Sequence, residues 1–176
     1  AFLDGGGPRG AAVRMLMSAL YKRALRRSDR VIFHNADDAR VLERRGIIPP
    51  SLPVTVVRGS GVDLSHFEPR PLPALDDGIT FLMIARLVRY KGVAEYCEAA
   101  RILTHDGVKA RFLLVGPEEA GPSGYPLSEL ETHGSAVTWL GPRDDVRTAI
   151  EDAHVYVLPS YGEGMPRTVL EAMATG

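Results

Sequence analysis

The chain has 176 residues and a mass of 19.1 kDa, and 45% of its residues are hydrophobic while 24% are charged. This composition is typical of globular proteins and excludes a disordered polymer, a collagen-like fibre and a disulfide-rich miniprotein. Twenty-one Lys and Arg against 22 Asp and Glu give a formal net charge of -1. Bulk positive charge therefore does not predict nucleic-acid binding, and any bound phosphate must be held locally.

The first third of the chain predicts two helices and two short strands in alternation. Residues 9–30 have a helical pattern, and residues 31–33 form a short β-branched and aromatic run. Asn35 is expected to cap a second helix, with acidic residues in its first turn, basic residues in its last and Gly46 just past its end. Residues 54–57 are expected to form the second strand.

The segment from Glu68 to Gly78 is predicted to be a linker. Pro69, Pro71 and Pro73 occupy alternate positions, and a proline has no backbone N–H for a regular hydrogen-bond ladder. Such a segment favours extended, polyproline-like structure. We therefore expect it to separate two parts of the chain, residues 1–67 and residues 79–176.

After the linker, strands and helices alternate. The strands are mostly continuous apolar runs, which is typical of strands that are buried on both faces of a parallel sheet. This alternation predicts a doubly wound α/β domain of the Rossmann-like kind, whose ligands bind beyond the carboxyl ends of its strands. The expected strands are 79–84, 110–115, 137–140 and 154–158, and the expected helices are 93–104, about 127–132, 144–152 and 166–174. The only cysteine, Cys97, is expected to be a small buried hydrophobe on the first of these helices.

Two cations lie where a ligand of such a domain would bind. Arg86 follows the strand 79–84, and Lys91 precedes the next helix with Gly92 beside it. Two cations joined by a short loop can hold a diphosphate from two sides through charge-assisted hydrogen bonds. The alternative is a pair of solvated surface charges.

The segment from Gly162 to Glu171 supplies a second group of candidates. Pro166 suits a first helical turn, so the backbone N–H groups at the start of this helix can bind an anion. Glu163 and Glu171 could accept hydrogen bonds from sugar hydroxyls on either side of that anion. A solvated loop glutamate and a helix glutamate in a surface ion pair are the alternative.

Together these residues resemble the donor-site signature of retaining glycosyltransferases of family 4, which have the two-domain GT-B fold. Arg86, Lys91 and Gly92 match the first part of that signature, and Glu163 and Glu171, with seven residues between them, match the second. The segments 33–38, 59–64, 81–87, 111–116, 139–147 and 158–167 are similar to the bacterial branch that extends polyprenyl-diphosphate-linked oligosaccharides. The resemblance therefore covers nearly the whole chain.

The resemblance implies transfer of a sugar, most often an N-acetylhexosamine, from a UDP-sugar to a lipid-linked saccharide with retention at the anomeric carbon. Arg86 and Lys91 would neutralise the leaving diphosphate without a metal ion or another cofactor, and Glu163 would contact the donor sugar. Glu171 would bind the ribose, and the loop from Gly141 to Arg143 would hold the base. The implied donor-binding residues are Gly116, Gly141, Arg143, Gly164, Met165, Pro166 and Glu171.

The same resemblance implies that the chain is a piece of a longer enzyme and is inactive as a transferase by itself. Residues 1–67 would be the end of an acceptor-side domain, and residues 79–176 would be most of the donor-binding domain. Ala85 departs mildly from the pattern, because the family often has glycine before the arginine. The glycine-rich loop and the acceptor-side residues of the family's first half would lie before Ala1.

A cytoplasmic location is expected, and attachment to an anionic membrane surface is an open alternative. Residues 1–30 hold seven Lys and Arg and two Asp, a net charge of +5, so the rest of the chain carries -6. A basic helix that also bears methionines and leucines could lie on anionic lipid near a lipid-linked acceptor. A core-packed helix with a solvated basic face explains the same pattern.

Two other functions stay open at this point. The chain could belong to another GT-B enzyme, such as a nucleotide-sugar epimerase or a transferase with a soluble acceptor. It could also be a nucleotide-binding module without catalytic activity. Transfer of sugar to a lipid-linked acceptor by the full-length protein would separate these from the leading interpretation.

Overall fold

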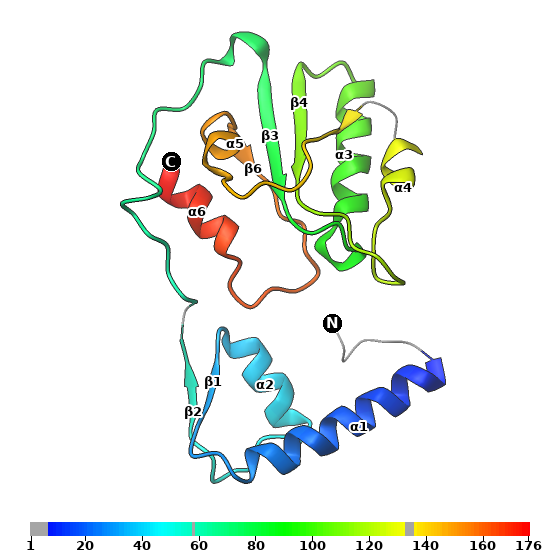
Figure 1. The fold of residues 1–176 in the computed structure, drawn as a ribbon, viewed down its shortest axis with the longest axis vertical. Helices are drawn as coiled ribbons and strands as arrows, with labels where there is room; N and C mark the ends of the chain where they lie inside the picture. The colour runs from blue at the N-terminus through cyan, green and yellow to red at the C-terminus, as the bar shows by residue number, and fades with distance from the viewer. Residues whose placement is uncertain (1–6, 58, 133–135) are drawn as a thin grey trace. The chain divides into compact units, whose positions relative to one another are not determined.

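A computed structural model describes residues 7–57, 59–132 and 136–176, with side chains from Gly10 onward. The described chain forms two compact units (Figure 1). The first comprises the residues up to Gly61 together with Gly164–Pro166, and the second comprises Val62–Glu163 and Arg167–Gly176. The predicted linker 68–78 therefore groups with the second unit, and the functional division of the chain into domains stays a prediction.

The first unit contains two helices and a two-stranded parallel sheet. Its elements are α1 (Gly7–Leu25), β1 (Val31–Phe33), α2 (Ala36–Arg44) and β2 (Val54–Val56). β1 and β2 pair in the register Val31 to Val54. The buried hydrophobic side chains of this unit come from α2 and the loop that follows it, and they are Ala39, Ile47, Ile48 and Leu52.

In the first unit the structure confirms the predicted start of α2 and places the end of α1 earlier than predicted. The predicted cap of α2 is confirmed, because the Asn35 side chain accepts a hydrogen bond of 2.7 Å from the backbone N–H of Asp38. α1 ends five residues earlier than predicted. From Arg27 the backbone hydrogen bonds tighten to a spacing of three residues, and the Ser28 hydroxyl donates to the carbonyl oxygen of Ala24.

The second unit is built on a four-stranded parallel sheet, as the alternating pattern predicts. The strands lie in the order β5-β4-β3-β6, and all neighbours pair in parallel. The chain adds β4 and then β5 on one side of β3, and it then crosses back to add β6 on the other side of β3. The strands are β3 (Ile79–Ile84), β4 (Ala110–Val115), β5 (Thr138–Trp139) and β6 (Val155–Tyr156). The helices are α3 (Val93–His105), α4 (Leu127–Thr132), α5 (Arg147–Glu151) and α6 (Arg167–Thr175), with short 3-10 turns η1 (Leu75–Asp77) and η2 (Arg89–Lys91).

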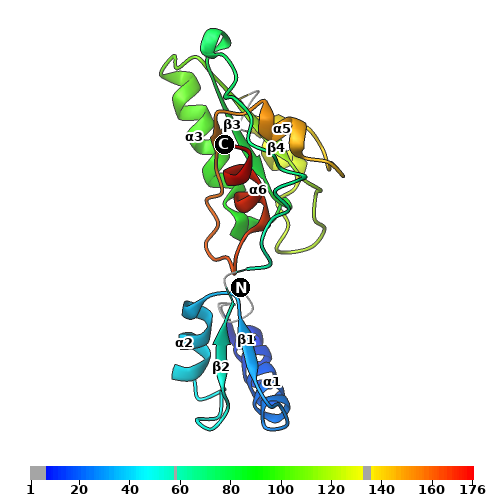
Figure 2. The same cartoon turned by 90° about the vertical axis from the view of Figure 1, so that its left-hand side faces the viewer.

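Helices cover both faces of this sheet. α3 and α4 pack on one face around Met83 and Leu114, while α5 and α6 pack on the other around Leu82 and Ile84 (Figures 1 and 2). Successive residues of β3 therefore enter opposite cores, because side chains alternate along a strand. This arrangement confirms the predicted doubly wound α/β fold and explains why β3 is mostly apolar.

In this unit the structure corrects one further sequence expectation, the start of α5, and confirms another, the burial of Cys97. α5 begins at Arg147 and not at residue 144, because the Asp145 carboxylate accepts a hydrogen bond of 3.0 Å from the Arg147 backbone N–H and forms a turn before the helix. Cys97 is fully buried on α3, as predicted, and burial raises the pKa of its thiol to about 11.

The proline-containing segment 68–78 lies along the second unit. Its residues 68–74 form no helix or strand, as expected of a linker, and η1 follows them. The backbone N–H of Arg70 donates to the carbonyl oxygen of Thr175, and the imidazole of His154 is 3.2 Å from the carbonyl oxygen of Pro73. The His154 ring also accepts from the backbone N–H of Thr80, so it ties this segment to the start of β3.

Candidate functional site

Arg86, the first predicted cation, lies directly beyond the carboxyl end of β3. One terminal nitrogen of its guanidinium is 3.3 Å from a carboxylate oxygen of Glu119, and the other donates to the hydroxyl of Tyr90 at 3.1 Å. The Arg86 side chain is 54% exposed. It is therefore held in place and is still open to a ligand.

Lys91, the second predicted cation, is paired with Glu163. The Lys91 ammonium is 2.5 Å from a Glu163 carboxylate oxygen, although 72 residues separate the two in sequence. Both side chains are mostly buried, with exposed fractions of 18% and 23%. The structure thus brings together two of the three residues that the resemblance assigns to catalysis.

Tyr90 connects the two cations. Its ring centroid lies 5.7 Å from the Lys91 ammonium, within the range of a cation–π interaction, while its hydroxyl accepts from Arg86. Arg86, Lys91 and Glu163 therefore form one group around a single tyrosine. Tyr90 lies outside the family signature, and the sequence analysis did not anticipate its contact with both cations.

Gly92 allows the loops after β3 and β6 to meet. It has a φ of 77° in the left-handed region, and a Cβ atom at this position would lie 2.2 Å from the carbonyl oxygen of Pro159. The backbone N–H of Tyr161 donates to the carbonyl oxygen of Tyr90 at 3.0 Å. Only a residue without a side chain fits this approach, which holds the loop of Glu163 against η2.

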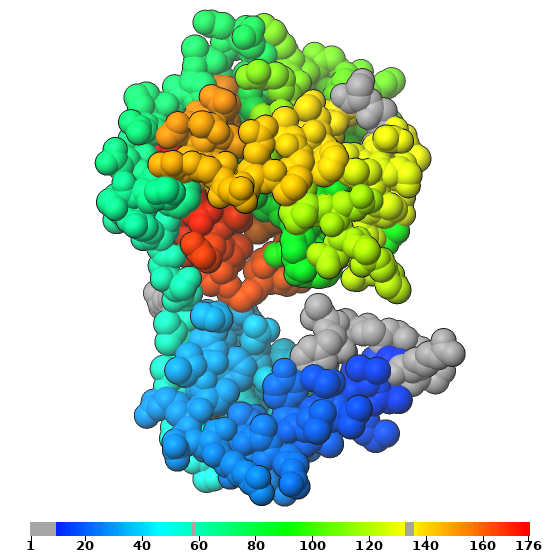
Figure 3. Space-filling model, in the orientation of Figure 1, coloured from blue at the N-terminus to red at the C-terminus, as the bar shows by residue number. Residues whose placement is uncertain are grey.

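A pocket of about 410 Å³ adjoins the start of α6 and the loop before α5. In Figure 3 the red segment of α6 and the orange segment before α5 lie side by side. Glu171 lines the pocket and is 8% exposed, with a carboxylate oxygen 3.7 Å from the Arg167 guanidinium. The pocket is also lined by His66, Phe67, Asp144, Asp145, Val146, Arg167 and Thr168.

The charge of this pocket suits hydroxyl and amine groups better than phosphate. Hydrogen bonds from the Arg147 side chain hold the pKa of Asp145 well below its usual range, so this carboxylate stays ionised. Asp145 and Glu171 thus contribute two acceptors to the pocket. The cations around Tyr90 suit a diphosphate, whereas this pocket suits a nucleoside.

Tyr156 feels the charge of both candidate carboxylates, Glu163 and Glu171, and the sequence analysis missed it. Its hydroxyl is hydrogen-bonded to the side chain of Thr168 at 2.6 Å and to the carbonyl oxygen of Ile84 at 3.2 Å. Burial, reinforced by the charges of Glu171 and Glu163, raises its pKa to about 12. A tyrosine inside an apolar strand needs a partner for its hydroxyl, and that signal could have marked it.

The glycines after β4 and β5 lie next to each other. The backbone N–H of Gly116 donates to the carbonyl oxygen of Gly141 at 3.0 Å, and the Trp139 indole donates to the carbonyl oxygen of Gly116. Arg143 is exposed, and its Nε donates to the carbonyl oxygen of Leu140. The structure thus gathers Gly116, Gly141 and Arg143 at one end of the sheet, and their contact with a nucleotide stays a prediction.

Gly164, Met165 and Pro166 join Glu163 to α6, which begins at Arg167, one residue later than predicted. By their contacts these three residues group with the first unit. Their predicted role beside the donor is thus not part of the geometry within the second unit. The backbone N–H groups in the first turn of α6 remain candidates for holding an anion.

Among the described residues, no three His, Cys, Asp or Glu side chains gather in a way that could hold a metal ion. The assignment of Arg86 and Lys91 to the work of a metal ion stays a prediction. The second unit thus offers two cations, an acidic pocket and a helix start at one edge of a parallel sheet.

The family model and the relatives that match this chain are all described as glycosyltransferases. Residues 78–176 match the family model described as "Glycosyl transferases group 1". The chain is 33% identical to the N,N'-diacetylbacillosaminyl-diphospho-undecaprenol alpha-1,3-N-acetylgalactosaminyltransferase of Campylobacter jejuni, and the match covers 97% of the chain and 46% of that protein. It is 27% identical to the UDP-Gal:alpha-D-GlcNAc-diphosphoundecaprenol alpha-1,3-galactosyltransferase of Escherichia coli, over 83% of the chain and 40% of that protein.

Solved structures show the same fold. A glycosyltransferase from Rickettsia africae superposes with a TM-score of 0.70 and 17% sequence identity, over 90% of this chain and 45% of that one. This similarity confirms the predicted GT-B type of α/β architecture. The chain spans less than half the length of the two curated relatives described above.

Proposed function

Because the chain belongs to the glycosyltransferase family described as "Glycosyl transferases group 1", we propose that it carries the donor site of an enzyme that extends a lipid-linked saccharide. The proposed reaction moves an N-acetylhexosamine from a UDP-sugar with retention at the anomeric carbon. The name of the first relative supports an N-acetylhexosamine as the transferred sugar, because that enzyme transfers N-acetylgalactosamine. The name of the second supports a UDP-sugar donor, because that enzyme uses UDP-galactose, and both names include a diphospho-undecaprenol acceptor.

The observation that carries the proposal is the gathering of complementary groups at the carboxyl ends of the strands. Arg86 and Lys91 follow β3, and Glu163 follows β6. The pocket with Glu171 lies beside the loop that follows β5. Ligands of doubly wound sheets bind at this edge, and here it offers cations for a diphosphate and carboxylates for sugar hydroxyls.

The geometry suggests how these residues would act on a donor. Arg86 and Lys91 would stabilise the negative charge that develops on the diphosphate as its bond to the anomeric carbon breaks. Glu163, which pairs with Lys91 in the structure, would accept a hydrogen bond from the donor sugar. Glu171 would accept hydrogen bonds from the ribose, whose position fixes the nucleotide.

The first test is calorimetric titration of UDP, GDP, ADP and TDP into the folded protein and its Glu171→Ala variant. We expect UDP to bind most tightly and the substitution to weaken UDP binding by about tenfold, since one hydrogen bond to a charged group contributes roughly 1.5–3 kcal/mol. The Glu151→Ala variant is a matched control. Glu151 is a carboxylate on α5 that pairs with Arg70 at 3.3 Å, and it does not line the Glu171 pocket.

The outcomes separate the competing functions. Equal affinities of the wild type and the Glu171→Ala variant would contradict the assigned ribose site. Binding of UDP without sugar transfer by the full-length protein would favour a nucleotide-binding module. Transfer only to a soluble acceptor, or epimerisation of the donor sugar, would favour the other GT-B enzymes.

We also propose that α1 brings the protein to an anionic membrane surface. Val13, Leu16 and Leu20 on this helix are each more than half exposed, and Lys22 and Arg23 occupy its last turn. Exposed apolar side chains next to cations are the combination that binds anionic lipid interfaces. Within the described residues, no helix is long and apolar enough to pass through a bilayer.

Liposome flotation of the full-length protein tests the membrane proposal. We expect binding to vesicles that contain anionic lipid, and loss of most of that binding when Arg23, Arg26 and Arg27 are all changed to Glu. The control variant reverses three charges on or next to α2 and carries Arg40→Glu, Arg44→Glu and Arg45→Glu. Unchanged flotation of the first variant, or equal loss in both variants, would contradict a specific role for α1.

A further inference from the structure

The Arg86 guanidinium already has an anionic partner in this chain. Glu119 lies 3.3 Å from one terminal nitrogen of Arg86, and Tyr90 occupies the other. Both members of the ion pair are accessible, with exposed fractions of 54% for Arg86 and 39% for Glu119. A ligand that needs Arg86 therefore meets a guanidinium whose two terminal nitrogens are both engaged.

Paired backbone segments bring Glu119 close to Arg86. Beyond their last strand residues, the loops after β3 and β4 continue side by side, and the backbone N–H of Leu87 donates to the carbonyl oxygen of Pro117 at 2.9 Å. Leu87 also forms a parallel bridge with Glu118. The fold thus holds Arg86 and Glu119 on adjacent loops, within reach of one another.

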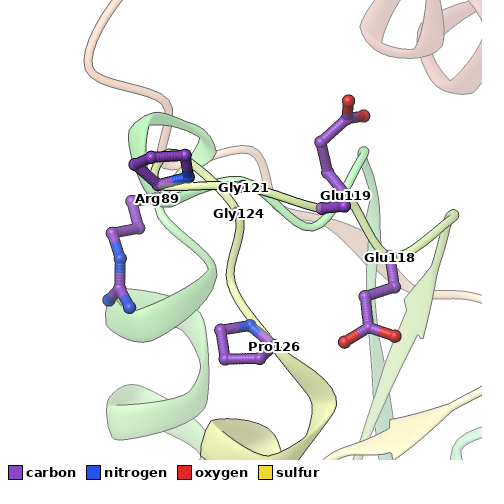
Figure 4. Close-up of a pocket in the computed structure, with 8 residues that line it drawn as sticks. Arg89, Glu118, Glu119, Gly121, Gly124 and Pro126 are labelled. Carbon is purple, nitrogen blue, oxygen red and sulfur yellow. The ribbon is translucent and has the colours of Figure 1, made fainter.

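The neighbouring acid, Glu118, has a different task. Figure 4 shows that the carboxylates of Glu118 and Glu119 point in different directions, although both residues line one pocket. A carboxylate oxygen of Glu118 accepts a hydrogen bond of 3.0 Å from the backbone N–H of Leu127, the first residue of α4. Glu118 therefore stabilises a helix start, whereas Glu119 faces a cation of the candidate site.

We propose that Glu119 competes with the diphosphate of the donor for Arg86 and thereby sets how tightly the nucleotide is held. This inference rests on the proposed function, because it takes Arg86 to be a phosphate ligand. It adds a residue that none of the sequence patterns marked. Glu119 is a positioning residue here, since it acts through Arg86 and not on the reacting atoms.

The energetics of the pair suit such a competition. Exposed ion pairs contribute little to stability, so a diphosphate with its greater charge can displace the Glu119 carboxylate. The displaced carboxylate stays nearby because its backbone is fixed, and it can take the guanidinium back when the nucleotide leaves. Glu119 would then lower the affinity for both donor and product.

The test is a double-mutant cycle on Arg86 and Glu119, read by calorimetric titration of UDP. Glu119→Gln keeps the size of the side chain but removes its charge, and we expect it to raise UDP affinity about three- to fivefold. In the Arg86→Ala background the same substitution is expected to have no effect. Glu118→Gln, whose amide oxygen can still accept from Leu127, is the matched control and is expected to leave affinity unchanged.

Each outcome decides between the alternatives. An unchanged or weakened affinity of the Glu119→Gln variant would overturn the inference, and so would an equal gain in the Arg86→Ala background or in the Glu118→Gln variant. A general effect of removing negative charge would give these last two results. If Arg86→Ala itself leaves UDP binding intact, or the wild type does not bind UDP, the proposed phosphate site is wrong and the inference falls with it.

Discussion

Replacement of Lys91 by alanine is expected to lower kcat/KM for sugar transfer by the full-length protein by about 100-fold. The reason is that Lys91 is a mostly buried cation at the proposed diphosphate site, and removal of one preorganised group that stabilises developing charge typically costs a factor of this size. The substitution also removes the 2.5 Å partner of Glu163. The measurement is the initial rate of transfer to a lipid-linked acceptor as a function of donor concentration.

A suitable control for Lys91→Ala is Arg101→Ala. Arg101 lies on α3 and pairs with Glu98 at 2.7 Å, but the pair is about half exposed and lies on the helix surface. We expect this variant to stay within twofold of the wild type, because exposed ion pairs contribute little. Activity of the Lys91→Ala variant within threefold of the wild type would remove Lys91 from the proposed site.

Replacement of Gly116 by alanine is expected to lower the free energy of unfolding by about 3 kcal/mol. Gly116 has a φ of 146°, a conformation that residues with a side chain rarely adopt, and a Cβ atom there would lie 1.9 Å from the carbonyl oxygen of Ala85. Both the strained backbone and the forced separation of the loops after β3 and β4 oppose folding. Urea denaturation followed by circular dichroism measures the change.

Gly107 is the matched control for this substitution. It has a φ of 76° in the left-handed region, but a Cβ atom there would meet nothing within 4 Å. Gly107→Ala is therefore expected to cost only the backbone strain, about 1 kcal/mol. If both variants lose the same stability, the loops after β3 and β4 can separate without cost, and the close approach of Gly116 to Ala85 adds nothing to the stability of the fold.

Local chemistry determined the elements that the sequence predicted well. The bounds of β3 and β4 agree with the apolar runs 79–84 and 110–115, because a strand buried on both faces admits few polar residues. The start of α2 was predictable from Asn35, whose side chain satisfies a backbone N–H within the same turn. The end of α1 and the start of α5 were predicted less well, since side chains decided them: the Ser28 hydroxyl donates to the Ala24 carbonyl oxygen, and the Asp145 carboxylate accepts from the Arg147 backbone N–H.

The sequence alone also named the cations and carboxylates of the candidate site, because their residue types and spacing form a family signature. It could not show that Lys91 pairs with Glu163, because this contact joins loops from two strands that are neighbours only in the folded sheet. The same holds for Tyr156, which links β6 to the end of β3 and to α6.

Tertiary structure alone decided what surrounds Arg86. Glu119 reaches this cation because parallel pairing continues past the ends of β3 and β4, and Tyr90, four residues after Arg86 in η2, accepts a hydrogen bond from it. Neither residue belongs to a pattern with a recognisable spacing. The sequence thus determines which charged groups the protein offers, and the packing of distant loops determines which partners hold those groups before a ligand arrives.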